Sequence, residues 1–203
     1  MPGTQIIKSK DFEALSEVKV DTRKRITLRK AKKAPKLAEY YRVYENSLGQ
    51  IVLDPMEIVP AYERWLHKNP KALESVKRGL AQAKSGKILP AKESFAKYAG
   101  DWLMPFALYF TPEAQAQYDS LKKNPSKIVV ESQIRKCLGY LEINPRHPSL
   151  KTHKFTSLQN PFNPKEPVFE AYAQNRTSGA YRIFWCYGPR KSELTIIAIT
   201  PHP

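Results

Sequence analysis

Segments in which apolar and polar residues alternate are expected to form strands in the first part of this chain. Residues 40–45 and 50–53 have this strand character, and the turn Asn46-Ser47-Leu48-Gly49 lies between them. This arrangement is typical of a hairpin. A further strand is expected over residues 18–28, interrupted by the polar run 21–25. The pattern therefore predicts short β-structure at the start of the chain.

Helical periodicity replaces this alternation over residues 61–68 and 70–85. In the second of these segments apolar residues recur at positions 73, 76, 80 and 83, and Gly86 follows its end, as glycine often does after a helix. This apolar stripe needs a surface to pack against. Residues 87–101 show no sustained period of 3.6 or 2, so a tail or linker is expected there.

The second part begins near Met104 and predicts the order strand, helix, helix and three strands. Thr111 and Pro112 mark the start of the first helix, and Asn144-Pro145 marks the end of the second. Successive short hairpins among the last strands predict an antiparallel sheet with both helices packed on one face. The expected fold class is α+β. In chain order, the expected elements are residues 106–110, 112–122, 125–143, 168–174, 180–187 and 194–199.

Composition indicates a globular protein with an excess of positive charge. Of the 203 residues, 41% are hydrophobic and 26% are charged, and the formal net charge is +15. Residues 1–103 have 21 Lys and Arg against 12 Asp and Glu, and residues 104–203 have 13 against 7, so neither half neutralises the other. A polyanionic partner is expected, with nucleic acid ahead of a membrane. The chain shows neither the apolar run of about 20 residues of a membrane span nor the apolar core of a signal peptide, which predicts a cytoplasmic protein without a membrane partner.

Positive charge is densest near the N-terminus. Residues 8–36 hold eleven Lys or Arg against four acids, with Arg23, Lys24 and Arg25 in an expected loop and Arg29 just beyond it. Phosphate contacts along a DNA duplex require such a density of cations. These four residues are candidates for DNA binding, and a basic surface that is merely solvated is the alternative.

Arg182 lies inside the otherwise apolar strand segment 180–187. A buried charge needs a partner or a ligand. The next strand leads to His202 near the chain end, so the hairpin is expected to bring a cation and an imidazole together, a pair that suits a phosphate-rich substrate. The alternatives are a structural ion pair between Arg182 and Glu170 and a frayed terminal histidine.

No metal site or cofactor is predicted. Cys137 and Cys186 have apolar neighbours, which is typical of buried reduced thiols. The three histidines that a zinc site would need show no regular ligand spacing. They are His147, His153 and His202.

Three segments of the second part resemble the RelE/ParE family of toxins from bacterial toxin-antitoxin systems. They are residues 144–154, Tyr181-Arg182-Ile183 and Ile199-Thr200-Pro201-His202-Pro203, and the similarity covers nearly all of residues 104–203. The resemblance implies a RelE/ParE-like antiparallel sheet with two N-terminal helices. It also implies metal-independent cleavage of messenger RNA, usually on the ribosome, by attack of a ribose 2′-hydroxyl on the adjacent phosphate.

The same resemblance implies roles for individual residues. Such a site needs cations for the phosphorane together with an acid and a base. Arg182 matches the family's strand arginine and would stabilise the phosphate, while His202 would protonate the leaving oxygen. Glu170 and Tyr172 share one face of their strand, Glu170 as candidate base and Tyr172 as a stacking or proton-transfer group. Contacts to the RNA backbone are expected from Lys151, His153 and Arg176, although an ordinary loop histidine is the alternative for His153.

The first part resembles AbrB/MazE-type antitoxins. Residues 21–28 stand where that family has its basic DNA-contacting loop, with Lys24 in place of the family's usual glycine. Residues 60–66, Asn69-Pro70 and the tail to Tyr98 are also similar to members of that group. The resemblance implies promoter binding, dimerisation through interleaved hairpins, and a C-terminal segment that wraps and inhibits a toxin.

Together the two resemblances predict neighbouring antitoxin and toxin genes read as one polypeptide, with Met104 the former toxin start. Residues 1–60 would be an AbrB-like swapped-hairpin domain that binds DNA and forms a homodimer. Residues 61–103 would be a helical toxin-neutralising segment and linker, and residues 104–203 the toxin domain. Because tethering raises the effective concentration of the inhibitor to roughly millimolar, the intact chain is expected to have low activity.

Two other functions remain open at this point. A ParE-like toxin that inhibits gyrase without chemistry has the same fold, so the fold does not separate it from a ribonuclease. A DNA-binding repressor with an inactive toxin domain is the third possibility.

Overall fold

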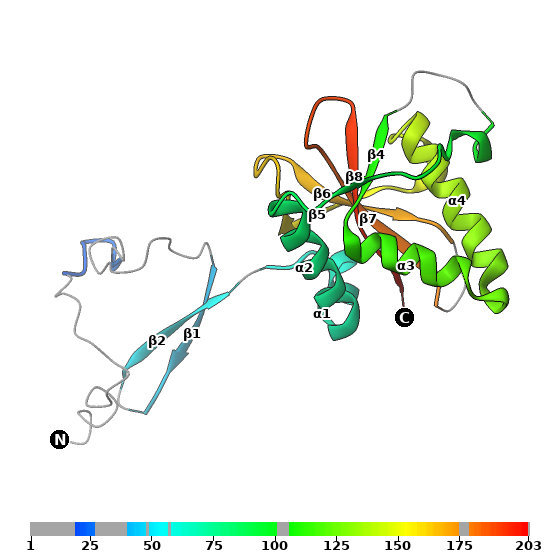
Figure 1. Cartoon of the computed structure of the whole chain (residues 1–203). Coiled ribbons are helices and arrows are strands. Elements are labelled where there is room, and N and C mark those ends of the chain that lie inside the picture. The colour runs from blue at the N-terminus through cyan, green and yellow to red at the C-terminus, as the bar shows by residue number, and fades with distance from the viewer. Residues whose placement is uncertain are drawn as a thin grey trace. The chain divides into compact units, whose positions relative to one another are not determined.

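The computed structural model describes residues 19–26, 40–47, 49–56, 58–100, 106–174 and 179–202. Four α-helices and two sheets form within these residues, so the fold class is α+β, as predicted. The chain divides into two compact units, residues 1–58 and 59–203 (Figure 1). The division falls next to the expected border at residue 60. Arg29, Met104 and Arg176, which the sequence analysis singled out, lie outside the described residues.

The first unit contains the predicted hairpin. Strand β1 (Tyr40–Glu45) pairs antiparallel with β2 (Ile51–Met56), and Gly49 in the connection has a φ of 73°, a conformation that favours glycine. Of the strand expected over residues 18–28, the described residues 19, 20 and 26 are not in a strand, so this part of the prediction is wrong, whereas the expected interruption at residues 21–25 is a turn. The Asp21 carboxylate closes the turn because it accepts the backbone N–H groups of Arg23 and Arg25, each at 2.9 Å.

The second unit contains a six-stranded sheet with helices around it (Figure 1). The sheet order is β3-β4-β8-β7-β6-β5. Its strands are β3 (Leu89–Pro90), β4 (Ala107–Phe110), β5 (His153–Gln159), β6 (Pro167–Tyr172), β7 (Tyr181–Tyr187) and β8 (Glu193–Pro201). The helices are η3 (Ala61–Glu63), α1 (Arg64–His67), α2 (Pro70–Lys84), η4 (Ala96–Tyr98), α3 (Pro112–Lys122), η5 (Pro125–Lys127), α4 (Ile128–Ile143) and η6 (Pro148–Leu150). None of the described helices is both long enough and apolar enough to cross a membrane.

The sheet is mixed, so the prediction of a purely antiparallel sheet is wrong. Strand β4 runs parallel to β8, whereas the other neighbouring strands are antiparallel. Two helices and three strands separate β4 from β8 along the chain. Leu108 and Phe110 of β4 are buried. A local hydrophobic pattern carries no information on whether a strand runs parallel or antiparallel to a partner so far along the chain.

Strand β5 occupies a segment between the expected elements 125–143 and 168–174, where no strand was expected, so His153 and Lys154 are strand residues. Phe155 is the buried residue of β5, and the pairing of β5 with β6 shifts register between Phe155 and Gln159. An edge strand with one buried side chain gives almost no alternation in the sequence. This weak pattern explains why the strand was missed.

Each face of the sheet carries its own hydrophobic core, because successive residues of a strand point to opposite faces. Ile183 and Trp185 of β7 pack with α3 and α4, which share one face as predicted. Phe184 and Cys186 pack on the other face with residues of α1 and α2, among them Leu66. The second face is therefore the surface that the apolar stripe of α2 needed.

Residues 87–100 pack against the sheet unit, so the expected tail or linker is wrong for this described part. Phe95 is 3% exposed and lies in the core beside α3 and α4. The Glu142 carboxylate of α4 accepts hydrogen bonds from Ser94 Oγ at 2.7 Å and from the Ala96 backbone N–H at 2.9 Å. Single anchors of this kind leave no periodic signal in the sequence.

Candidate active site on one sheet face

Arg182 lies on β7, an inner strand, and is 6% exposed. Its Nη1 donates to the backbone oxygens of Gln174 at 2.8 Å and of Tyr181 at 3.3 Å. The guanidinium carbon lies 3.6 Å from the centre of the Tyr172 ring, which is a cation–π contact. Arg182 is therefore the buried charge that the sequence predicted.

Glu170 of β6 lies on the same face and is 1% exposed. Its Oε1 is 3.6 Å from Nε of Arg182, and neither of these two atoms has a hydrogen-bond partner among the described residues. Burial raises the pKa of Glu170 to about 7, although the charge of Arg182 and a hydrogen bond from Trp65 act in the opposite direction. A carboxyl group with this pKa exchanges protons near neutral pH, as a catalytic acid or base must.

Tyr172 and His153 extend the row of polar side chains across β6 and β5. Tyr172 stands opposite Arg182 in the register of β6 with β7. His153 stands opposite Glu170 in the register of β5 with β6, and its ring lies 5.4 Å from that of Tyr172. Burial raises the pKa of Tyr172, so its phenol stays protonated at neutral pH and can donate a hydrogen bond.

His202 follows the end of β8 and lies half-buried beside this face. Its backbone N–H donates to the Ala180 carbonyl at 2.7 Å, which ties the residue to the start of β7. The imidazole ring lies 4.4 Å from the ring of Trp65. His202 is thus held in place, in contrast to the frayed end that the sequence left open.

Two aromatic residues from the segment before α2 lie over this face. Tyr62 donates a hydrogen bond from its hydroxyl to the Lys154 carbonyl at 2.9 Å, and its ring is 5.6 Å from that of His153. Trp65 packs against His202 and hydrogen-bonds to Glu170. We call the segment from Ala61 to His67, which comprises η3 and α1, the cover segment. Two of the polar residues that carry the candidate chemistry therefore lie against it.

Glu63 fixes the cover segment to the edge strand β5. It is fully buried, and its carboxylate accepts the backbone N–H of Thr156 at 2.7 Å and that of Ser157 at 3.0 Å, along with both hydroxyl groups. Burial favours the neutral form of Glu63, but the hydrogen bonds from Ser157 and Thr156 outweigh it and lower the pKa. Sequence reasoning singled out this segment but not Glu63. The sequence signal that could have indicated Glu63 is its position between the aromatic residues Tyr62 and Trp65.

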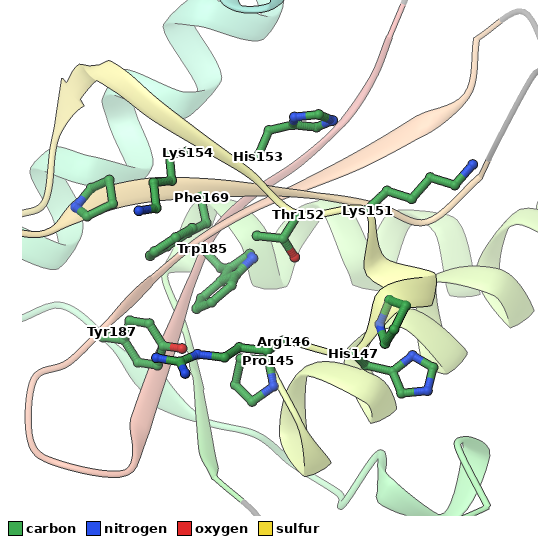
Figure 2. A pocket seen from close by; sticks show the side chains of 12 residues that line it. Pro145, Arg146, His147, Lys151, Thr152, His153, Lys154, Phe169, Trp185 and Tyr187 are labelled. Atoms are coloured by element: carbon green, nitrogen blue, oxygen red, sulfur yellow. The ribbon is translucent and has the colours of Figure 1, made fainter.

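The two described RNA-contact candidates both line one cavity, although the ring of His153 lies near Tyr62 and Tyr172. His153 belongs to the face of Arg182. Lys151, with a φ of 44°, follows η6 and lines a cavity with Phe169 and Trp185 on the face of α3 and α4 (Figure 2).

In the first unit, the turn at residues 21–25 presents the described DNA-binding candidates to solvent. The Arg25 guanidinium pairs with Asp21 at 2.7 Å, while Arg23 and Lys24 are exposed beside it. Lys24 has a φ of 57°, in the left-handed region that glycine adopts most readily. The backbone at Lys24 thus has the conformation that suits a glycine at this position.

The three histidines lie in separate surroundings. His147 stacks on Tyr140 with 4.1 Å between ring centres, His153 lies between Tyr62 and Tyr172, and His202 lies on Trp65. In the described part of the chain, no three His, Cys, Asp or Glu side chains gather as metal ligands do. Cys137 and Cys186 are buried and free, as predicted, and burial raises the pKa of Cys137 to about 12.

Comparison with known proteins gave no match to this chain, whether to a protein-family model, to a curated protein or to a solved structure. The arrangement of Arg182, Glu170, Tyr172 and His202 is therefore the evidence that bears on function.

Proposed function

We propose that this chain is a toxin-antitoxin fusion whose second unit is a metal-independent endoribonuclease, held inactive by its own cover segment. The observation that carries the proposal is the buried arrangement of Arg182 beside Glu170, a carboxyl group with a pKa of about 7. A buried structural ion pair is favourable only where hydrogen bonds satisfy its remaining donors and acceptors. Here Arg182 Nε and Glu170 Oε1 both lack a partner among the described residues, which is consistent with a site made for a substrate.

The groups on this face match the needs of RNA cleavage by a ribose 2′-hydroxyl. Glu170 takes the proton of the 2′-hydroxyl as its oxygen attacks the adjacent phosphorus. Arg182 stabilises the negative charge of the phosphorane. The bond from phosphorus to the 5′-oxygen then breaks, and His202 donates a proton to that oxygen. The products are a 2′,3′-cyclic phosphate and a free 5′-hydroxyl, with Tyr172 placed to hydrogen-bond the substrate.

The cover segment explains why the intact chain would be nearly inactive. Tyr62 and Trp65 pack on His153 and His202, where the RNA strand would have to lie. Since Trp65 also hydrogen-bonds to Glu170, it competes with the substrate for the proposed base. Truncation of these two side chains to alanine is expected to open the site, while α2 stays packed on the same face of the sheet.

The test uses the full-length chain in three forms: wild type, the double variant Tyr62→Ala/Trp65→Ala, and this double variant with Arg182→Ala added. Each protein is incubated with messenger RNA, alone and with ribosomes, in the presence of a chelator. We expect new 5′-hydroxyl ends with the double variant and few with the other two. Arg64→Ala, an exposed change in the same helix, is the control and should behave as wild type.

Two results would redirect the proposal. Growth arrest on expression of the double variant with intact RNA would favour a gyrase-inhibiting toxin. A double variant that neither cleaves RNA nor arrests growth would favour a DNA-binding repressor with an inactive toxin domain. In both cases Arg182 would be a structural residue.

For the first unit we propose promoter binding by a homodimer. Arg23 and Lys24 lie in an exposed turn, as phosphate-contacting cations must. The hairpin exposes large apolar side chains, including Val43 at 61% and Ile51 at 64%, and an isolated two-stranded hairpin is marginally stable in water. A second copy would cover these side chains. Light scattering should therefore give a dimer, and Arg23→Ala should weaken binding to the upstream DNA of its own gene and reduce the salt dependence of that binding.

A further inference from the structure

A cavity of about 770 Å³ lies at the β5 edge of the sheet, on the side of Phe169 and Trp185, and its lining includes His153 but none of Arg182, Glu170, Tyr172 and His202. It opens between the loop after α4, the strand β5 and the outer part of β6 and β7 (Figure 2). Its lining residues include Arg146, Lys151, Thr152, Lys154, Phe169 and Tyr187, together with Trp185. We call it the aromatic pocket.

Three aromatic rings form one wall of this pocket. Phe169 and Trp185 stack with 4.6 Å between ring centres and an angle of 17°, and Tyr187 meets both of them edge-on. Trp185 is 1% exposed, whereas Phe169 and Tyr187 are half-buried and leave ring surface open to the cavity. A planar apolar ligand would find a preformed stacking surface there.

Two polar atoms at this wall have no partner. The Trp185 indole nitrogen and the Thr152 hydroxyl are both buried without a hydrogen bond among the described residues. Figure 2 shows the nitrogen edge of the indole on the side of the cluster that faces Thr152. A buried donor left unpaired is costly, so a ligand with acceptor atoms on its edge would repay it.

Cations surround the opening. Arg146, Lys151 and Lys154 are exposed, and the lining residues include neither Asp nor Glu. Figure 2 shows Arg146 reaching from its loop toward Tyr187. The pocket therefore combines a stacking surface, donors for a planar edge and a positive rim.

We propose that the aromatic pocket binds one nucleotide of single-stranded RNA. The base stacks on the open face of Phe169 and meets Tyr187 edge-on, its polar edge is turned toward Thr152, and the adjoining phosphates lie along Lys151 and Lys154. Sequence-tolerant binding of single strands commonly joins aromatic stacking with such a cationic track. Duplex nucleic acid does not fit this site, because its bases are stacked inside the helix and do not enter a cavity.

The position of the pocket connects it to the proposed active site. β5 is an edge strand, and its successive residues His153 and Lys154 point to opposite faces, His153 toward Tyr172 and Lys154 toward Phe169. An RNA strand that passes around this edge would reach both faces within a few nucleotides. As a subsite for the cleaved RNA the pocket rests on the proposed function, whereas its affinity for a nucleotide does not depend on cleavage.

The test measures binding by the full-length protein of a fluorescein-labelled RNA octamer whose 2′-hydroxyls are methylated, so that it binds without being cleaved. Phe169→Leu is expected to weaken binding about 5-fold or more, the loss of one stacked base. Lys154→Ala should weaken it less and lower the slope of log affinity against log salt by about 0.7, the loss of one phosphate contact on a single strand. Lys71→Ala, an exposed change on α2, is the matched charge control and should leave the pocket's affinity unchanged.

Further measurements distinguish RNA from free nucleotide as the ligand, and distinguish failure of the pocket proposal from failure of the proposed nuclease. Free mononucleotide should compete with the octamer only weakly, whereas equal competition would identify the pocket as a site for free nucleotides and overturn the RNA assignment. Unchanged affinity in both Phe169→Leu and Lys154→Ala would overturn the pocket, even if the opened chain cleaves RNA. Added to the opened variant Tyr62→Ala/Trp65→Ala, Arg182→Ala should lower cleavage by about 10²- to 10³-fold and keep pocket binding. If no variant cleaves RNA but Lys154→Ala and Phe169→Leu still lower affinity, the proposed nuclease fails and the pocket stands.

Discussion

The two faces of the β5–β8 sheet carry different kinds of polar chemistry, although they share the same strands. On one face Arg182 and Glu170 are almost fully buried and lie beside a cover segment. On the other face the cations Lys151 and Lys154 are exposed around the aromatic pocket. The division follows the strand pleat, which sends Glu170 to the first face and its neighbour Phe169 to the second.

The two faces differ in how far their charged side chains are removed from water. Desolvation raises the pKa of Glu170 to about 7 and concentrates the field of Arg182, which is what a proton-transfer site needs. Exposed lysines keep their hydration and attract phosphates from a distance, which suits affinity rather than catalysis.

Arg182→Ala should have the largest effect on the buried face. In the opened variant Tyr62→Ala/Trp65→Ala, we expect it to lower the rate of RNA cleavage by about 10²- to 10³-fold, the usual cost of removing one donor to transition-state charge. The measurement is single-turnover cleavage. A loss below about 3-fold would assign Arg182 to structure. Lys191→Ala, an exposed change in the turn after β7, is the control.

The pH dependence of Glu170 comes next. As a base, Glu170 must be ionised, so cleavage by the opened variant should fall as the pH drops through the pKa of Glu170 in that variant, and Glu170→Gln should remove most of the activity. Stability should change in the opposite sense. Because the folded state holds this proton more tightly than the unfolded state, wild type should lose on the order of 3 kcal/mol relative to Glu170→Gln as the pH rises from about 4.5 to about 7. Urea unfolding across this range measures the difference, and parallel curves would contradict the buried acid.

Two helical glycines allow the faces to be loosened separately. An added Cβ at Gly79 of α2 would meet the Ile197 carbonyl of β8, and one at Gly139 of α4 would meet the Phe95 carbonyl. Each change to Ala should lower the free energy of unfolding by about 2 kcal/mol, since helix and backbone must move apart. We expect Gly79→Ala to increase cleavage by the otherwise wild-type chain and Gly139→Ala to leave cleavage unchanged. Equal effects on cleavage would show that the two faces are not independent.

Glu63→Gln should give the smallest effect, because it keeps the shape of the side chain and one oxygen acceptor. The loss of charge-assisted hydrogen bonds to Thr156 and Ser157 should lower the free energy of unfolding by about 1 kcal/mol. Since the pKa of Glu63 is lowered on folding, this contribution is present above about pH 4.5 and is lost as the pH falls further. Chemical denaturation at pH 7 and pH 3 measures it. Glu74→Gln, which removes an exposed ion pair with Arg78, is the control with little expected effect.

Much of the secondary structure could be predicted because it is locally encoded. The hairpin of β1 and β2 and the helices α2, α3 and α4 formed within a residue or a few of their expected limits. Strand β5 could not be predicted, since one buried side chain leaves no period, and the direction of β4 could not, since its partner is far along the chain.

The candidate site was partly predictable for the same reason. Arg182 inside an apolar strand, and Glu170 in alternation with apolar residues, are local signals that placed both on one sheet face. Trp65 and Glu63 were not predictable as neighbours of that face, because about 100 residues separate them from Glu170 and Ser157, and no local pattern encodes such a contact.

The strong positive charge, the main helices and hairpin, and the presence of a charged residue in a buried strand can all be read from the amino-acid sequence. These follow from composition and from short-range periodicity. The folded structure was needed to show that the cover segment lies beside Glu170 and His202, that burial raises the pKa of Glu170 to about 7, and that Phe169, Trp185 and Tyr187 line a cation-rimmed cavity. Each of these depends on desolvation and on contacts between distant segments, which exist only once the chain has packed.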